Sequence, residues 1–149
     1  MIDDLYSARI LTLAANMPRS GRLPSPDGTG HRVAKLCGST ATVDVILDKA
    51  GRVADYAQAV KACALGQAAA GVLGAQVIGA TGDEIEQARD ALLAMLKSGG
   101  EGPHGRFAEL QVLKQVAGYP ARHASTLVAV EAALDAVRAA ERARLSGAA

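Results

Sequence analysis

The segment Thr40–Val60, TATVDVILDKAGRVADYAQAV, decides the fold. Residues 40–48 alternate in polarity as a half-buried strand does, with Ala41, Val43, Val45 and Leu47 on one face and Thr42, Asp44 and Asp48 on the other. Lys49-Ala50-Gly51 ends in glycine, which suits a type I turn closed by a left-handed residue. Residues 52–60 return as a second strand, so the segment is predicted to form a β-hairpin.

The rest of the chain adds one strand before the hairpin and helices on both sides of it. Arg32–Cys37 is expected to be extended, after a Pro- and Gly-rich loop over residues 18–30. Apolar spacing predicts helices over 3–16, 65–77, 82–97, 107–117 and 120–144, followed by a frayed tail. Strands followed by helices indicate an α+β fold, a small three-stranded antiparallel sheet covered by about five helices on one face. Residues 1–149 are expected to form a single domain with its core over about 4–138.

Composition excludes several classes of protein. The chain has 149 residues, of which 50% are hydrophobic, 21% charged and 3% aromatic, with a net charge of +1. A packed core is therefore expected, without the basic surface or the aromatic platform of a nucleic-acid-binding protein. The acidic N-terminus does not resemble a signal peptide, and the most apolar window, 63–80, is interrupted by two glutamines and four glycines. We expect a cytoplasmic protein, with no membrane segment and reduced thiols.

The hairpin register brings the chain's two cysteines together. If Asp48 faces Arg52 across the loop, the same register places Cys37 opposite Cys63. A bulge or an early end to pairing would relax this, so the prediction is that both thiols lie at one end of the hairpin. Two sulfurs so placed can bind a soft metal, hold one edge of a cluster, exchange sulfur or form a disulfide. Cys63 also opens a predicted helix, whose N-terminus favours the thiolate.

Four segments carry a family resemblance. They are Asn16–Gly21 (NMPRSG), Ala34–Ser39 (AKLCGS), Val60–Ala68 (VKACALGQA) and Tyr119–Leu127 (YPARHASTL). In this order, over about residues 4–135, they resemble the iron–sulfur cluster scaffold family of the IscU, SufU and NifU N-terminal type. The resemblance implies a scaffold and not an enzyme. Such a scaffold receives sulfur as persulfide from a cysteine desulfurase, combines it with iron, and passes a labile [2Fe–2S] cluster to recipient apo-proteins.

The resemblance also implies a ligand set, from which this chain departs. The family's first two cysteines match Cys37 and Cys63, its aspartate falls on Ser39, and its third cysteine falls on Ala124, beside His123. The expected site is therefore Cys37, Cys63 and His123 as metal ligands, with Ser39 beside them. Arg122 is positioned by the same motif to offset negative charge.

Iron–sulfur clusters normally take four protein ligands, so three arrangements stay open. One chain could hold a cluster through Cys37, Cys63 and His123 with an outside ligand. Two chains could combine their cysteine pairs in a homodimer. The protein could instead be a zinc-binding or metal-free relative that acts as a binding partner of a cysteine desulfurase, because Zn²⁺ tolerates mixed Cys/His sites. Neither Ser39 nor Ser125 lies in a Gly-x-Ser-x-Gly elbow, which argues against serine hydrolysis.

Overall fold

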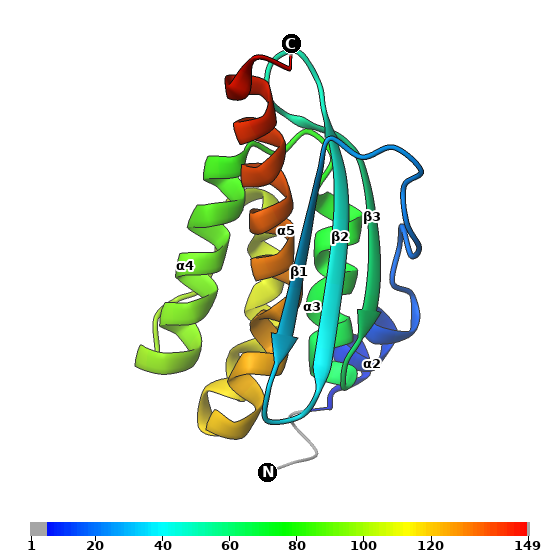
Figure 1. Cartoon of the computed structure of the whole chain (residues 1–149). Helices are drawn as coiled ribbons and strands as arrows, with labels where there is room; N and C mark the ends of the chain where they lie inside the picture. Colours follow the sequence, from blue (N-terminus) through cyan, green and yellow to red (C-terminus); the bar gives the residue numbers. More distant parts are fainter. Residues whose placement is uncertain (1–5, 149) are drawn as a thin grey trace.

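Three antiparallel strands in the order β1-β2-β3 form a sheet whose one face is covered by helices (Figure 1). A computed structural model describes residues 6–148. The described elements are α2 (Ala8–Ala15), β1 (Gly28–Ala34), β2 (Ser39–Leu47), β3 (Val53–Lys61), α3 (Ala64–Gln76), α4 (Gly82–Ser98), η1 (Gly105–Gly118), η2 (Pro120–Arg122), α5 (His123–Ala143) and η3 (Arg144–Ala148). The predicted α+β class and three-stranded sheet are confirmed.

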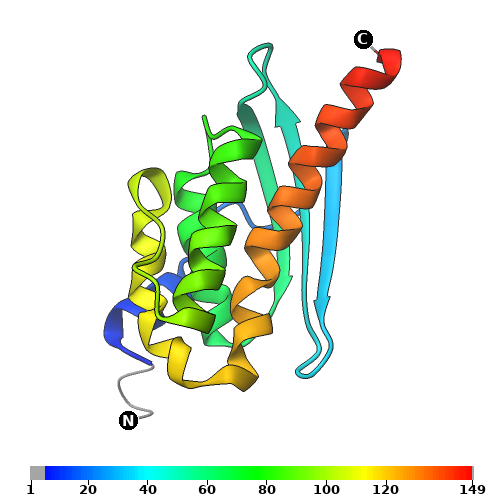
Figure 2. The same cartoon turned by 90° about the vertical axis from the view of Figure 1, so that its left-hand side faces the viewer.

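Helix α5 runs along the sheet and packs on β1 and β2 (Figure 2). This contact is close because β1 presents glycine to the helix: a Cβ atom on Gly28 or Gly30 would overlap the backbone carbonyl of Ala136 or Ala132. Helix α3 packs on α2, α5 and β3, while α4 packs on α5. Between residues 6 and 148, no helix is both long and apolar enough to cross a membrane.

The hairpin is confirmed, with one change of register. Gly51 closes the turn at φ 81°, and the Asp48 N–H donates to the carbonyl of Arg52 at 2.8 Å, as the predicted loop requires. A β-bulge then lies between the pairs Leu47–Val53 and Ile46–Asp55, and pairing ends at Thr40 and Lys61. Cys37 and Cys63 therefore do not lie directly opposite each other, because the bulge shifts the register by one residue and pairing ends before either cysteine.

The strand predicted at Arg32–Cys37 lies earlier in the chain. β1 begins at Gly28, which pairs with Val45, and ends at Ala34, so Cys37 belongs to the turn that joins β1 to β2. The expected loop over residues 18–30 is correspondingly shorter. Two of the glycines that suggested a loop, Gly28 and Gly30, are in fact the residues that let this strand approach α5.

The predicted helices lie where expected and are largely of the expected type, but the tail expected to be frayed forms the π-helix η3 (Arg144–Ala148). In α4, Thr81 and Glu84 form a capping box, and Gly99 closes the helix in the left-handed conformation at φ 71°. α2 begins after the cap Ser7, and residues 3–5 of the helix predicted over 3–16 lie outside the described residues. η1 forms as a 3₁₀ helix instead of an α-helix, with a kink at Phe107.

The outer face of the sheet is crossed by the segment between α2 and β1. Its Gly21 N–H donates to the carbonyl of Gln58 on the edge strand β3, and Ser20 forms a parallel bridge to the same residue. Beneath this segment Asp44 is fully buried and accepts hydrogen bonds from Arg22, Thr29 and the Leu23 N–H. Alternation put Asp44 on the face away from the core, and the covering segment buries it there.

Candidate functional site

The two cysteines lie at the same end of the sheet. Cys37 is exposed in the four-residue turn before β2, and Gly38 continues this turn in the left-handed conformation at φ 73°. Cys63 follows β3 directly and is the N-cap residue of α3, where it is half-buried. The prediction that both thiols share one end of the hairpin is confirmed.

A chain of hydroxyl contacts connects the two sulfurs. Cys37 Sγ lies 3.1 Å from Ser39 Oγ, Ser39 Oγ lies 3.0 Å from Ser125 Oγ, and Ser125 Oγ lies 3.2 Å from Cys63 Sγ. Both serines are buried, at 5% exposure for Ser39 and 1% for Ser125. Three separate parts of the chain thus meet here: the β1–β2 hairpin, the start of α3 and the first turn of α5.

Cys63 is favoured as a thiolate. Partial burial raises the pKa of its thiol, but hydrogen bonds from Ser125, from the N–H groups of Gly66 and Leu65, and from Arg122 outweigh burial, so the pKa lies below its ordinary value. The two N–H groups belong to the first turn of α3, where backbone donors lack intrahelical partners. The expected effect of a helix N-terminus on this thiol is confirmed, and Arg122 is among the groups that favour its charge.

The pKa of Cys37 also lies below its ordinary value. The Ser39 hydroxyl is the main cause, followed by the Ser39 N–H, and the small effect of burial does not offset them. Because Cys37 is also exposed, it meets both conditions for a reactive thiol, thiolate character and access.

The contacts around the two sulfurs can be satisfied by the hydrogen atoms that the site carries. The three contacts of the hydroxyl chain need three hydrogen atoms, of which the two serine hydroxyls supply two and one thiol supplies the third. A second thiol proton can point to the carbonyl of Ala34, 3.9 Å from Cys37 Sγ. The thiol protons have to leave when both sulfurs bind a metal as thiolates.

Ser125 is the site residue that the sequence analysis missed. The motif placed Ala124 in the third cysteine position, but Ala124 is exposed and only the next residue turns its side chain toward the thiols. One feature of the sequence could have indicated Ser125. It is a small polar residue in the first turn of a helix whose start lies beside the two thiols, and such a residue is a candidate neighbour for them.

His123 lies apart from the hydroxyl chain. It is buried, and its Nε2 donates to the carbonyl of Val116 at 2.9 Å, which leaves Nδ1 as the free ring nitrogen. Within the part of the chain that the structure describes, no group of three His, Cys, Asp or Glu side chains is close enough to hold a metal ion. The structure thus brings together Cys37, Cys63 and Ser39 of the predicted site, with Ser125 added.

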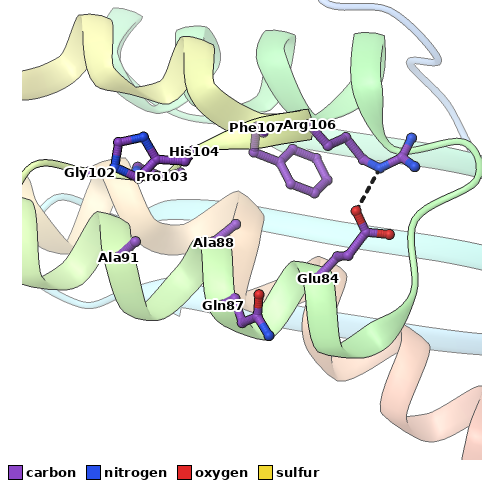
Figure 3. A pocket seen from close by; sticks show the side chains of 10 residues that line it. Glu84, Gln87, Ala88, Ala91, Gly102, Pro103, His104, Arg106 and Phe107 are labelled. Atoms are coloured by element: carbon purple, nitrogen blue, oxygen red, sulfur yellow. Dashed lines mark hydrogen bonds and ion pairs between the residues drawn. The ribbon is translucent and has the colours of Figure 1, made fainter.

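A separate pocket of about 300 Å³ lies between α4 and the start of η1 (Figure 3). Glu84 and Arg106 form an ion pair at 3.1 Å along it, and His104 and Phe107 complete one wall. Arg106 also donates to the carbonyls of Gln76 and Ile78, so its guanidinium connects the start of η1 to the end of α3. None of the predicted site residues lines this pocket.

Comparison with known proteins identifies the family. No protein-family model matches the chain, and no curated protein matches it. The solved structure of a nitrogen-fixing NifU-like protein (N-terminal) from Brucella abortus is 50% identical, covers 95% of this chain and 97% of its own, and superposes with a TM-score of 0.91. The chain belongs to the NifU N-terminal-like scaffold family.

The family assignment confirms the resemblance drawn from the four motifs. An iron–sulfur cluster assembly scaffold protein for the SUF system, from Fervidobacterium islandicum, is 21% identical over 91% of this chain and 98% of its own, with a TM-score of 0.81. At that identity the likeness shows that the fold is shared. Because this is a family of scaffold proteins, the expectation that the chain is not an enzyme is also confirmed.

Proposed function

We propose that the protein is an iron–sulfur cluster assembly scaffold, acting in the cytoplasm. The observation that carries the proposal is the pair of thiols, each with a lowered pKa, joined through two buried hydroxyls at one end of a NifU-like fold. Iron and sulfide are the cargo of this site, and they would form a labile [2Fe–2S] cluster that passes to recipient apo-proteins. Cys37 and Cys63 supply the thiolates.

Cys63 is the better sulfur acceptor in this proposal. Its thiolate attacks the outer sulfur of a persulfide carried by a cysteine desulfurase, a new S–S bond forms at Cys63, and the donor cysteine leaves as a thiolate. The transferred sulfur stays at the persulfide oxidation level, so this transfer needs no oxidant or reductant. Its later conversion to sulfide takes two electrons from an external reductant, such as a dithiol. The N–H groups at the start of α3 and Arg122 favour the attacking form.

The ligands beyond the two thiolates distinguish the arrangements that the sequence left open. His123 can join the metal through Nδ1 while its Nε2 keeps the Val116 carbonyl. Ser39 and Ser125 offer oxygen, a harder and weaker donor for iron than sulfur. A homodimer would instead combine two cysteine pairs into four thiolates around one cluster.

Anaerobic reconstitution with Fe³⁺ and sulfide tests the proposal. The wild-type protein should develop visible sulfur-to-iron charge-transfer absorption, and Cys37→Ala and Cys63→Ala should each lose at least about 90% of it, because two thiolates are the minimum that holds a cluster edge. His123→Ala should reduce the yield, whereas His104→Ala, an exposed histidine away from the thiols, should retain it.

Other outcomes have definite meanings. Full cluster yield in His123→Ala, with one cluster per two chains by native mass spectrometry, contradicts the Cys/Cys/His site and favours the homodimer. Stoichiometric zinc with no charge-transfer absorption contradicts cluster assembly. It favours the zinc-binding relative that acts as a partner of a cysteine desulfurase, since Zn²⁺ accepts two thiolates with harder ligands.

A further inference from the structure

Ser125 occupies the centre of the thiol end, although the family pattern assigns no role to a hydroxyl there. It is 1% exposed, and its Oγ lies 3.0 Å from Ser39 Oγ and 3.2 Å from Cys63 Sγ. A buried hydroxyl in the first turn of a helix usually bonds to its own backbone, as the neighbouring Thr126 does to the carbonyl of Arg122. Ser125 instead joins the sheet to the start of α3.

The position of Cys37 depends on this junction. Cys37 Sγ lies 3.1 Å from Ser39 Oγ, and its other hydrogen-bond contact, to the carbonyl of Ala34, is longer at 3.9 Å. The turn around it is otherwise open, because a side chain added at Gly38 would meet nothing within 4 Å. Ser39, held in turn by Ser125, is therefore the group that fixes the Cys37 thiol relative to the rest of the site.

The packing of α3 on α5 brings Ser125 within reach of Cys63. A Cβ atom on Gly66 would lie 2.8 Å from the backbone oxygen of Ser125, closer than real Cβ contacts allow, and 3.2 Å from its Oγ, closer than most of them. Glycine at this position lets the two helix starts approach until the hydroxyl meets the sulfur. This backbone contact is independent of the hydroxyl chain and fixes Ser125 at the same place.

We propose that Ser125, acting through Ser39, is the positioning residue of the dithiol site. The two hydroxyls hold the sulfurs of Cys37 and Cys63 toward a common point before any metal or sulfur arrives, so that little ordering is left to do on binding. The inference rests on the proposed function only in that the thiols act together on a soft ligand. It does not require a cluster to form.

Binding of two simple probes tests the proposal: Co²⁺ alone, followed by its sulfur-to-cobalt charge-transfer band, and phenylarsine oxide, which condenses with two neighbouring thiols and releases water. Ser125→Ala and Ser39→Ala should each bind both probes about tenfold more weakly than wild type, the loss expected when a hydrogen-bonded partner is removed. The double variant should lose less than the product of the two factors, since both serines act in one chain.

Thr126→Val is the matched control, because it removes a buried hydroxyl from the next residue of α5 that contacts neither thiol. It should bind both probes within about twofold of wild type. Thermal unfolding of each variant shows whether the fold is retained, and Ser39→Ala serves if Ser125→Ala does not fold. Wild-type affinity in both serine variants, or equal weakening in Thr126→Val, would overturn the proposal. Absence of cluster formation in wild type alongside intact probe binding would reject the scaffold function and leave this inference standing.

Discussion

At the scale of single residues, two hydroxyls accompany the two thiols: Ser39 stands where the family pattern has a carboxylate, and Ser125 directly follows the position of its third cysteine. A hydroxyl is a neutral hydrogen-bond donor and a weak ligand for iron, so Ser39 and Ser125 organise the thiolates without adding charge to the site. Arg122 and the first turn of α3 favour the charge that remains on Cys63. Under the proposed scaffold function, such a site should hold a cluster less firmly than a site with three thiolates, as transfer to a recipient would require.

A third thiol introduced by mutation will report which residue of α5 faces the site. Ser125→Cys should raise the intensity of the sulfur-to-cobalt band by about one half, in proportion to three thiolates in place of two. Ala124→Cys is the control, and it should leave the band unchanged because residue 124 is exposed on the neighbouring side of the helix. A stronger band in Ala124→Cys alone would contradict the placement of Ser125.

Sequence alone could predict only part of this site. Cys37 and Cys63 follow from their places beside one hairpin, whatever its exact register, and Ser39 follows from its place in the motif that resembles the family. Ser125 could not be fixed in the same way, because adjacent residues of a helix point about 100° apart and a shift of one residue turns the side chain away. Only the packing of α5 on α3, which depends on Gly66, shows that residue 125 and not residue 124 meets the thiols.

At the scale of elements, the bulge in β3 shows what alternation can and cannot reveal. Val53 and Tyr56 are both buried on the helix side, although residues three apart in a regular strand face opposite sides. The extra residue between them resolves this conflict, and it moves the register on the thiol side by one. A bulky apolar pair at that spacing was the sequence signal, but the strand's many alanines obscured it.

The contact of β1 with α5 predicts a large cost for one added methyl group. Gly30→Ala should lower the free energy of unfolding by about 1–3 kcal/mol, because the new Cβ atom would overlap the carbonyl of Ala132 and force the strand off the helix. Gly118→Ala is the control, since a Cβ atom there meets nothing within 4 Å, and it should change stability by less than about 0.5 kcal/mol. Urea unfolding measures both. Equal stability of the two variants would contradict the close packing.

At the scale of the whole molecule, α5 is fastened to the sheet near both of its ends. Ser125 meets the hairpin at the thiol end, and Arg144 donates to the carbonyls of Leu47 and Asp48 beside the β2–β3 turn, both at 2.7 Å. Arg32 and Asp135 pair between these points. These contacts of α5 with the sheet therefore fix the position of Ser125. The arrangement of the thiol site depends on how the helix layer packs on the sheet.

The opposite face of the sheet depends on a buried carboxylate and provides the last prediction. Burial of Asp44 raises its pKa, but hydrogen bonds from Arg22, Thr29 and the Leu23 N–H outweigh burial and hold the pKa below its ordinary value of about 3.9. A carboxyl group with a lowered folded pKa stabilises the fold above its unfolded pKa, and this contribution disappears as the pH falls through the folded pKa.

Asp44→Asn should therefore cost about 2 kcal/mol of unfolding free energy at pH 7, the typical loss when charged hydrogen bonds to a buried group are weakened. The difference between wild type and variant should shrink steadily as the pH falls below 4, because the wild type loses its advantage there and the amide does not titrate. Urea unfolding between pH 7 and pH 3 measures it, with Asp55→Asn as the control, since the Asp55 side chain on β3 is 49% exposed and its ion pair to Arg19 is 3.6 Å long. A difference that stays constant with pH would show that Asp44 contributes through packing and not through its charge.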